Sequence, residues 1–220
     1  MTSDSTSSVS GPIFGPDFQA QLEALLVWRR DVRRFRHDPL PPGMLERLVG
    51  LADLAPSVGL SQPWRFVRVV SPELRAFVRR NFAAANAEAL ADYDGGQAAL
   101  YARLKLSGLD EAPEQLAVFA EVDPGQGRGL GRRTMPETLQ YSTVCAVHTL
   151  WLAARAAGIG VGWVSILNAE ELCRDLDVPE SWRLVAYLCL GYPEEDHDDP
   201  ELARRGWEER RGAASPILVR

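Results

Sequence analysis

The sequence predicts an α+β domain in which helices flank a central sheet. Apolar residues recur at helical spacing in several segments, short β-branched runs lie between them, and the order of the two does not form a regular βαβ repeat. The chain has 220 residues, 46% of them hydrophobic, so it can bury a sizeable core. We expect an N-terminal flexible arm at 1–16, one main domain at 17–207 and a C-terminal tail at 208–220.

Helices are expected where apolar residues recur every three or four positions between boundary signals. Asp17 suits an N-cap, Pro41 suits a first helical turn, and Pro56 marks where the second helix must stop. The polar run "DYDGG" interrupts the chain after the third helix, and Gly158 ends a long apolar helix that follows the glycine-rich loop 124–133. The expected helices span residues 17–28, 41–55, 71–91, 97–106, 134–157 and 169–178.

Strands are expected where β-branched and aromatic residues alternate or form short buried runs. The segments "RFVRVV", "QLAVFAEV", "GVGWVSIL" and "WRLVAYLCLGYP" meet this criterion at residues 65–70, 115–122, 160–167 and 182–193. Residues after Pro193 are acidic and are expected to be irregular. Neither glycine-rich segment has the G-x-G-x-x-G spacing of a dinucleotide loop, which argues against a Rossmann site.

Composition and isolated reactive residues narrow the function classes. A formal net charge of −6 argues against broad nucleic-acid binding. Cys145, Cys173 and Cys189 are far apart in the sequence and are expected to be reduced core residues, while His148 within a helix is expected to be packed. No metal-ligand set or Ser-His-Asp set follows from the spacing. Without a leader-like or membrane-length apolar segment, we expect a cytoplasmic protein.

Two short segments each allow a structural and a functional interpretation. In "WRRDVRRF", the arginines could form a solvated helix end, or they could bind a phosphate while holding Asp31 ionised. In "PSVGLSQPW", the segment could be a surface turn closed by Trp64, or a loop whose backbone approaches a flat ligand while Ser57 and Gln62 donate hydrogen bonds. The residues alone do not decide between these alternatives.

Together with a terminal "GYP", these two segments resemble the FMN-dependent nitroreductase family over about residues 18–207. The resemblance implies a nitroreductase-like three-layer fold, with a central mixed or antiparallel sheet flanked by helices. It also implies a homodimer in which two subunits share each FMN. Charge and hydropathy separately predict no nucleic-acid or membrane partner.

Asp31 stands where ordinary members of that family usually carry Ser or Thr. With "LKLSGLDEAP", "GLGRRTMPET", "YSTVCAVHTLWLAARAAGIGVGWVSIL" and Gly206-Trp207, it resembles the BluB-type branch of the family. Members of this branch use O2 to fragment reduced FMN to 5,6-dimethylbenzimidazole, the lower ligand of cobalamin, and erythrose 4-phosphate. FMN would then be the substrate. A separate NAD(P)H-dependent flavin reductase is one source of its reduced form, which the sequence leaves open.

The resemblance also assigns roles to single residues. Asp31 would act as general acid or base beside the ribityl chain, and Ser165 would hydrogen-bond the flavin or its oxygen adduct. For Ser165, a hydroxyl bonded to nearby backbone is the structural alternative. FMN contacts are implied for Arg29, Arg30, Asp31, Val32, Arg33, Ser57, Gln62, Leu104 and Ser165. The residues themselves predict a lid at 92–106, because the glycines of "DYDGG" give it hinges and "LYARLKL" gives it an apolar underside. Its hydrogen exchange should then change when reduced FMN is added.

Two rival functions remain open at this stage. An NAD(P)H-dependent nitroreductase or flavin reductase would keep FMN intact, and a non-catalytic flavin-binding protein would only store or sense it. Asp31 argues against the first rival, and the presence of both Asp31 and Ser165 argues against the second. Ser61 and Ala120-Glu121 depart from the branch's usual Met and Cys-Asp, which concerns the pocket lining more than the reaction type.

Overall fold

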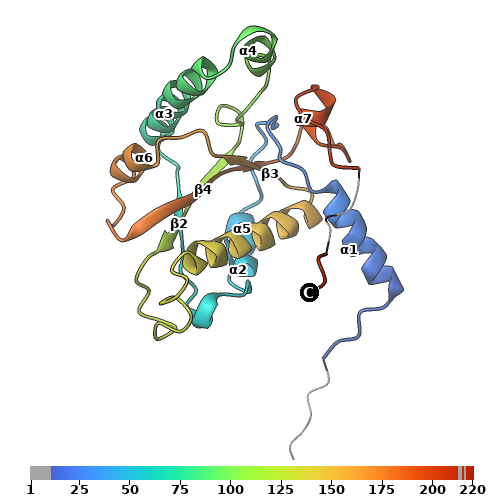
Figure 1. Cartoon of the computed structure of the whole chain (residues 1–220), viewed down its shortest axis with the longest axis vertical. Coiled ribbons are helices and arrows are strands. Elements are labelled where there is room, and N and C mark those ends of the chain that lie inside the picture. Colours follow the sequence, from blue (N-terminus) through green and yellow to red (C-terminus); the bar gives the residue numbers. More distant parts are fainter. Residues whose placement is uncertain (1–10, 213–214, 216) are drawn as a thin grey trace, which may run out of the picture.

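The computed structural model describes residues 11–212, 215 and 217–220 and has three layers (Figure 1). The helices are α1 (Pro16–Trp28), α2 (Met44–Ala52), α3 (Pro72–Ala91), α4 (Gly95–Tyr101), α5 (Thr138–Ala156), α6 (Ala169–Asp175) and α7 (Glu201–Arg204), with a 3-10 turn, η1 (Val58–Leu60). The strands are β1 (Trp64–Arg68), β2 (Glu114–Glu121), β3 (Gly160–Val164) and β4 (Trp182–Gly191).

The expected helices and strands are present, with small corrections at their boundaries. Helix α1 begins at Pro16 after Gly15 as N-cap, so Asp17 lies in the first turn instead of capping it. Residues 134–137 form turns, and α5 begins at Thr138. The acidic segment after Pro193 is not wholly irregular, because it contains α7. Most of the expected N-terminal arm, residues 1–10, lies outside the described residues, and the three expected domain boundaries stay predictions.

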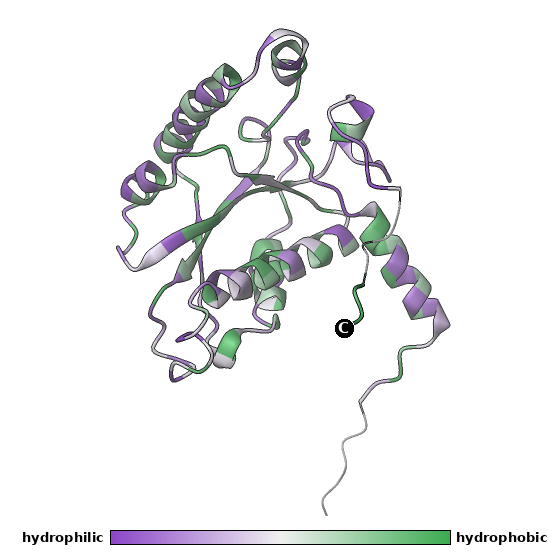
Figure 2. Cartoon of the chain, viewed as in Figure 1, coloured by the Kyte–Doolittle hydropathy of each residue, from purple (hydrophilic) through white to green (hydrophobic). Residues whose placement is uncertain are grey.

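The four strands form one antiparallel sheet in the order β1-β2-β4-β3. Side chains alternate between its faces, so Leu116 and Val118 point to one helical layer while Ala117 and Phe119 point to the other. This arrangement confirms the α+β class. Figure 2 shows that the central strands are mainly hydrophobic, whereas α1 and α3 carry many hydrophilic residues.

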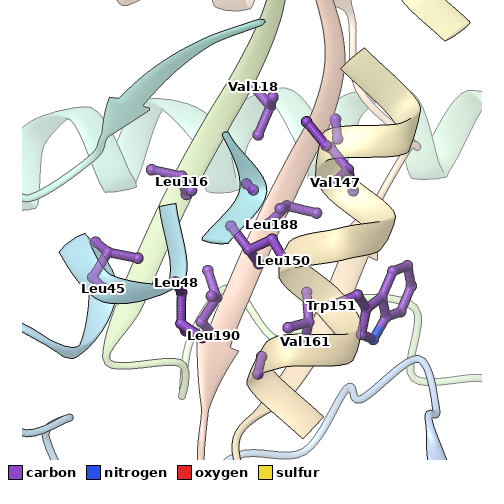
Figure 3. Close-up of a cluster of buried hydrophobic side chains, with 14 of the residues drawn as sticks. Leu45, Leu48, Leu116, Val118, Val147, Leu150, Trp151, Val161, Leu188 and Leu190 are labelled. Atoms are coloured by element: carbon purple, nitrogen blue, oxygen red, sulfur yellow. The ribbon is translucent and has the colours of Figure 1, made fainter. Parts of the chain in front are cut away.

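Helices α2 and α5 cover one face of the sheet, and α3 and α6 cover the other (Figure 1). On the first face, Leu48 from α2 and Leu150 from α5 meet Leu188 from β4 (Figure 3). Both helices thus bury one apolar stripe, as their sequence spacing predicts. No helix among the described residues has the length and hydrophobicity needed to cross a membrane.

Some surface positions differ from the sequence-based expectations. Cys189 is buried and Cys173 half-buried, but Cys145 is exposed, so the prediction that all three lie in the core was wrong for Cys145. His148 is also exposed instead of packed. Both residues lie on α5, whose periodic apolar character extends onto a face that this single chain leaves uncovered.

Residues 31–35 lie against the outer edge of β3, and glycines allow this close approach. Asp31 forms a parallel bridge with Val161, and the backbone N–H of Val32 donates to the Val161 carbonyl at 3.0 Å. A Cβ atom on Gly162 would lie 2.1 Å from the carbonyl oxygen of Val32. Any side chain at residue 162 would therefore push this segment away from the sheet.

Gly162→Ala should lower the free energy of unfolding by at least about 2 kcal/mol, because the added methyl group meets backbone that cannot rotate away. Gly50→Ala is the matched control, since a Cβ there meets nothing within 4 Å in the exposed part of α2. Removing a helical glycine should raise stability by up to about 1 kcal/mol. Urea unfolding followed by circular dichroism measures both, and equal stability of the two variants would contradict the packing argument.

Candidate functional site

The carboxylate of Asp31 is fixed by one backbone group and one guanidinium. Its Oδ1 accepts a hydrogen bond from the backbone N–H of Trp163 at 2.9 Å, and its Oδ2 accepts one from Nε of Arg33 at 3.0 Å. The Trp163 contact joins residues 132 positions apart in the chain. About a third of the side chain, 34%, remains exposed, so Asp31 is held in one orientation yet accessible to a ligand.

Arg33 connects this carboxylate to the segment expected to act as a lid. Its Nη2 lies 3.0 Å from Oδ2 of Asp31, and its Nη1 donates to the carbonyl oxygen of Lys105 at 3.1 Å. Leu104, a predicted FMN contact, precedes that carbonyl and is half-buried. The structure thus brings Asp31, Val32, Arg33 and Leu104 into one neighbourhood.

The segment 92–106 is covered by an aromatic cluster. The rings of Tyr93 and Tyr101 stack with centroids 5.0 Å apart, and the ring of Trp207 meets Tyr93 edge-on at 5.5 Å. Trp207 follows α7, which is anchored by an ion pair between Glu201 and Arg34. The predicted lid therefore contacts the arginine cluster near both of its ends. Near its start the contact runs from Tyr93 through Trp207 and α7 to Arg34, and near its end Arg33 bonds the Lys105 carbonyl directly.

Arg29 and Arg30 contact Trp151, whereas Arg33 contacts Asp31 and Lys105. The guanidinium of Arg29 lies 5.0 Å from the centre of the Trp151 ring, and the carbonyl of Arg30 accepts from Nε1 of the same tryptophan. The Nε of Arg30 is buried and has no hydrogen-bond partner among the described residues. An anion would satisfy this donor after a shift of the Arg30 side chain, because the atom has almost no accessible surface as it stands.

Electrostatics support the same conclusion for Arg30. Burial and the positive charges of Arg210 and Arg29 lower the pKa of its guanidinium, which Asp198 and Asp199 oppose. Arg210 was not identified by the sequence analysis. Its only signal was a basic pair in "EERRG" after an acidic stretch, and its proximity to Arg30 depends on the path of the C-terminal segment.

A cavity of about 530 Å³ adjoins these residues. The residues that line it include Arg30, Asp31, Arg33, Trp151 and the segment 194–197, which carries three carboxylates. Its volume is typical of pockets that hold small molecules and cofactors. The solvated-helix-end interpretation of "WRRDVRRF" does not account for a carboxylate oriented at the wall of a pocket.

Ser165 lies at the same end of β3 as the Asp31 carboxylate. It follows the last strand residue, Val164, and stands two positions, about 7 Å, beyond Trp163. Its side chain is exposed, and its hydroxyl has no hydrogen-bond partner in the described part of the chain. The alternative in which this hydroxyl is bonded to nearby backbone is therefore not seen.

Ser57 and Gln62 are not brought to Asp31 within one chain. The hydroxyl of Ser57 accepts from the backbone N–H of Gln62 at 3.1 Å, and the N–H of Val58 donates to Oγ of Ser142 on α5. Trp151, which contacts the arginine cluster, lies nine residues further along α5, or about 13 Å along the helix axis. The two predicted halves of the site thus lie at separate places on α5.

Comparison with known proteins identifies the family. The nitroreductase family model matches residues 26–192, and the chain belongs to this family. The 5,6-dimethylbenzimidazole synthase of Rhodospirillum rubrum is 55% identical, covering 92% of this chain and 96% of the relative. The synthase of the same name from Rhodobacter capsulatus is 54% identical, covering 86% and 91% of the two chains.

Solved structures support the fold assignment. The structure of oxidised iodotyrosine deiodinase bound to FMN and 3-iodo-L-tyrosine is 25% identical, with a TM-score of 0.68, covering 90% of this chain and 97% of that one. A BluB-like flavoprotein from Clostridium difficile has a TM-score of 0.64 at 19% identity, covering 90% and 99%. The nitroreductase-like fold is thereby confirmed, and FMN is the cofactor indicated by the family and by the bound neighbour.

Burial raises the pKa of Asp31 above its ordinary value, while Arg33 and the N–H of Trp163 oppose this rise without cancelling it. Because the folded pKa exceeds the unfolded one, Asp31 favours the folded state most at pH values below the unfolded pKa. This contribution is lost as the pH rises through the folded pKa. At neutral pH the ionised carboxylate therefore costs stability.

Asp31→Asn should remove that pH-dependent cost. As the pH rises from about 4 to about 8, the free energy of unfolding of Asp31→Asn should increase relative to that of the wild type. Urea unfolding at a series of pH values measures this difference. Ser165→Ala alters a non-titrating group nearby and should show no such trend, whereas a difference for Asp31→Asn that is flat or falls with pH would contradict the raised pKa.

Proposed function

We propose that the protein is a 5,6-dimethylbenzimidazole synthase, which uses O2 to fragment reduced FMN to 5,6-dimethylbenzimidazole and erythrose 4-phosphate. The observation that carries the proposal is the carboxylate of Asp31, oriented by Arg33 and Trp163 at the wall of a pocket. Identity of 55% to a synthase of that name over nearly the whole chain supports the reaction.

The arginines suit the phosphate of FMN. Arg29, Arg30 and Arg210 place three positive charges close enough to lower the pKa of one of them, and Arg30 keeps a buried donor without a partner. A phosphate dianion would satisfy that donor and relieve the repulsion between the guanidiniums. Bound FMN supplies the ring that reacts with O2 and the sugar chain that is cut.

Asp31 is the proposed proton-transfer group. Its raised pKa brings it closer to neutral pH, where a carboxyl group both accepts and releases protons efficiently. Its two hydrogen bonds hold the oxygens in place, so little reorganisation is needed when a proton moves. Val32 and Leu104 would line the neighbouring wall.

Ser165 and the lid complete the proposed site. The free hydroxyl of Ser165 would donate a hydrogen bond to the flavin ring at the end of β3. Trp207 packs against Tyr93, just before helix α4, and against Tyr101 at its end. Held in this way, α4 would keep bulk water away from the reacting ring.

The first test is to mix the purified protein with reduced FMN in air and to detect 5,6-dimethylbenzimidazole by chromatography and mass spectrometry. Product should form in proportion to protein, and Asp31→Asn should reduce it by about 100-fold or more while FMN binding is retained. Ser165→Ala should lower the yield less.

Reoxidation of FMN without loss of flavin would instead favour an NAD(P)H-dependent nitroreductase or flavin reductase. One relative, the putative NAD(P)H nitroreductase YfhC of Bacillus subtilis, is 26% identical over 84% of this chain and 89% of its own length. Wild-type yield from Asp31→Asn would remove that residue from the mechanism.

We infer further that the working form is a homodimer. The loop with Ser57 and Gln62 lies away from the arginine cluster in one chain, so a second copy is needed to bring these residues to the FMN ring. Helix α5 leaves Tyr141, Val144, Cys145 and His148 exposed on one face. Such a face suits an isologous contact between two copies of the helix.

Mixing two impaired variants tests this sharing. Asp31→Asn damages the arginine side of each site, and Gly59→Val damages the loop side, because a Cβ on Gly59 would lie 2.9 Å from the Leu130 carbonyl oxygen. With random pairing, each mixed dimer contains one undamaged site, so product formation should return to roughly a quarter of the wild-type level. No recovery after subunit exchange would mean that each chain forms its own site.

A further inference from the structure

The loop that follows Ser57 contains two non-glycine residues with left-handed backbone conformations. Leu60 has φ of 56° and Gln62 has φ of 41°, and Leu60 is 69% exposed. Residues with a β-carbon rarely adopt such angles unless the surroundings hold them there. Hydrogen bonds within the loop, such as that from the N–H of Gln62 to the Ser57 hydroxyl, hold part of this shape, and contacts outside the loop hold the rest.

Those contacts come from the glycine-rich segment 126–131, which we call the brace. Nε2 of Gln126 donates to the carbonyl oxygen of Leu60 at 2.6 Å and to Oε1 of Gln62 at 3.1 Å. One amide group thus holds both non-glycine residues of the loop that have positive φ angles. The distances are those of ordinary to short hydrogen bonds.

Glycines let the brace lie directly on the loop. A Cβ on Gly127 would lie 2.9 Å from both the carbonyl oxygen of Gly59 and Cβ of Ser61, and a Cβ on Gly131 would lie 2.7 Å from Cγ2 of Val58. Larger residues would separate the two segments. This contact explains why a run of glycines occurs here, although the run lacks the spacing of a nucleotide-binding loop.

We propose that the brace fixes Leu60 against the flavin ring of FMN bound by a second copy of the chain, with Gln126 and Gly127 as positioning residues. The proposal rests on the proposed function and on the shared site. An apolar side chain held over the ring keeps water from the reacting face, so that reduced FMN is fragmented instead of being merely reoxidised. A loosened Leu60 would let reoxidation compete.

Gln126→Glu and Gly127→Ala test the brace. The first is isosteric but replaces the donating amide by a carboxylate that faces the Leu60 carbonyl, and the second adds a methyl group 2.9 Å from the carbonyl oxygen of Gly59. Gly125→Ala is the matched control, because a Cβ there meets nothing within 4 Å. The measurement is 5,6-dimethylbenzimidazole formed per reduced FMN consumed, together with the melting temperature and the KM for reduced FMN.

Both brace variants should lose at least about tenfold in product per FMN consumed, since small displacements of a positioned group have effects of this size. The melting temperature of Gln126→Glu should stay close to that of Gly125→Ala, which should keep the wild-type yield. Gly127→Ala should melt at a lower temperature, because its φ of 84° and the nearby backbone of Gly59 and Ser61 strain any residue with a β-carbon. Gln126→Asn, with a shorter amide, should recover part of the loss. Wild-type yields from both brace variants, or an equal loss in Gly125→Ala, would overturn the proposal.

The brace and the proposed reaction can fail separately. A wild-type protein that binds FMN but forms no 5,6-dimethylbenzimidazole would refute the proposed function alone. In that case the fluorescence of bound oxidised FMN tests whether the brace positions Leu60, because a leucine packed on the flavin ring changes the polarity around that ring. A spectrum that differs between wild type and Gln126→Glu supports the brace, and identical spectra overturn it.

Discussion

The structure depends on the contact between residues 31–35 and the edge of β3. Asp31 reaches the backbone of Trp163 only because Gly160 and Gly162 leave room for Val32, whose carbonyl would meet a Cβ on Gly162 at 2.1 Å. The same contact places Arg30 beside the pocket and lets Arg33 reach the carbonyl of Lys105. One backbone pairing thus positions the carboxylate, the cationic cluster and the segment 92–106 that is predicted to be a lid.

Much of the fold could be predicted from the sequence because each element carries a local signal. The alternation in "RFVRVV" and the helical period before Gly158 are properties of single segments, and both predictions were confirmed. The four residues of α7 were missed, since so short a helix is held by tertiary contacts such as the Glu201–Arg34 ion pair. The burial of Cys145 was wrongly predicted because an apolar helix period does not say which side of the helix the rest of the chain covers.

The candidate site was predictable only in its residue types. The family resemblance selected Asp31 and Ser165, but the sequence did not reveal that Asp31 bonds a backbone group 132 residues away. Nor did it bring Arg210 to Arg30, because long-range proximity leaves no mark in a single sequence. The glycine loop was recognised as irregular, yet its closeness to the segment 57–62 became clear only from the distances between them.

Helix α1 carries a consequence for how the protein folds. It has 13 residues, none of them buried, and it exposes Phe18, Leu22 and Trp28. An isolated helix of this length is marginal in water. If a second copy covers α1, the helix becomes ordered only when the two chains associate. Part of the stability of each chain then depends on protein concentration. Dilution would then weaken the N-terminal region before it weakens the sheet, as linkage between folding and assembly requires.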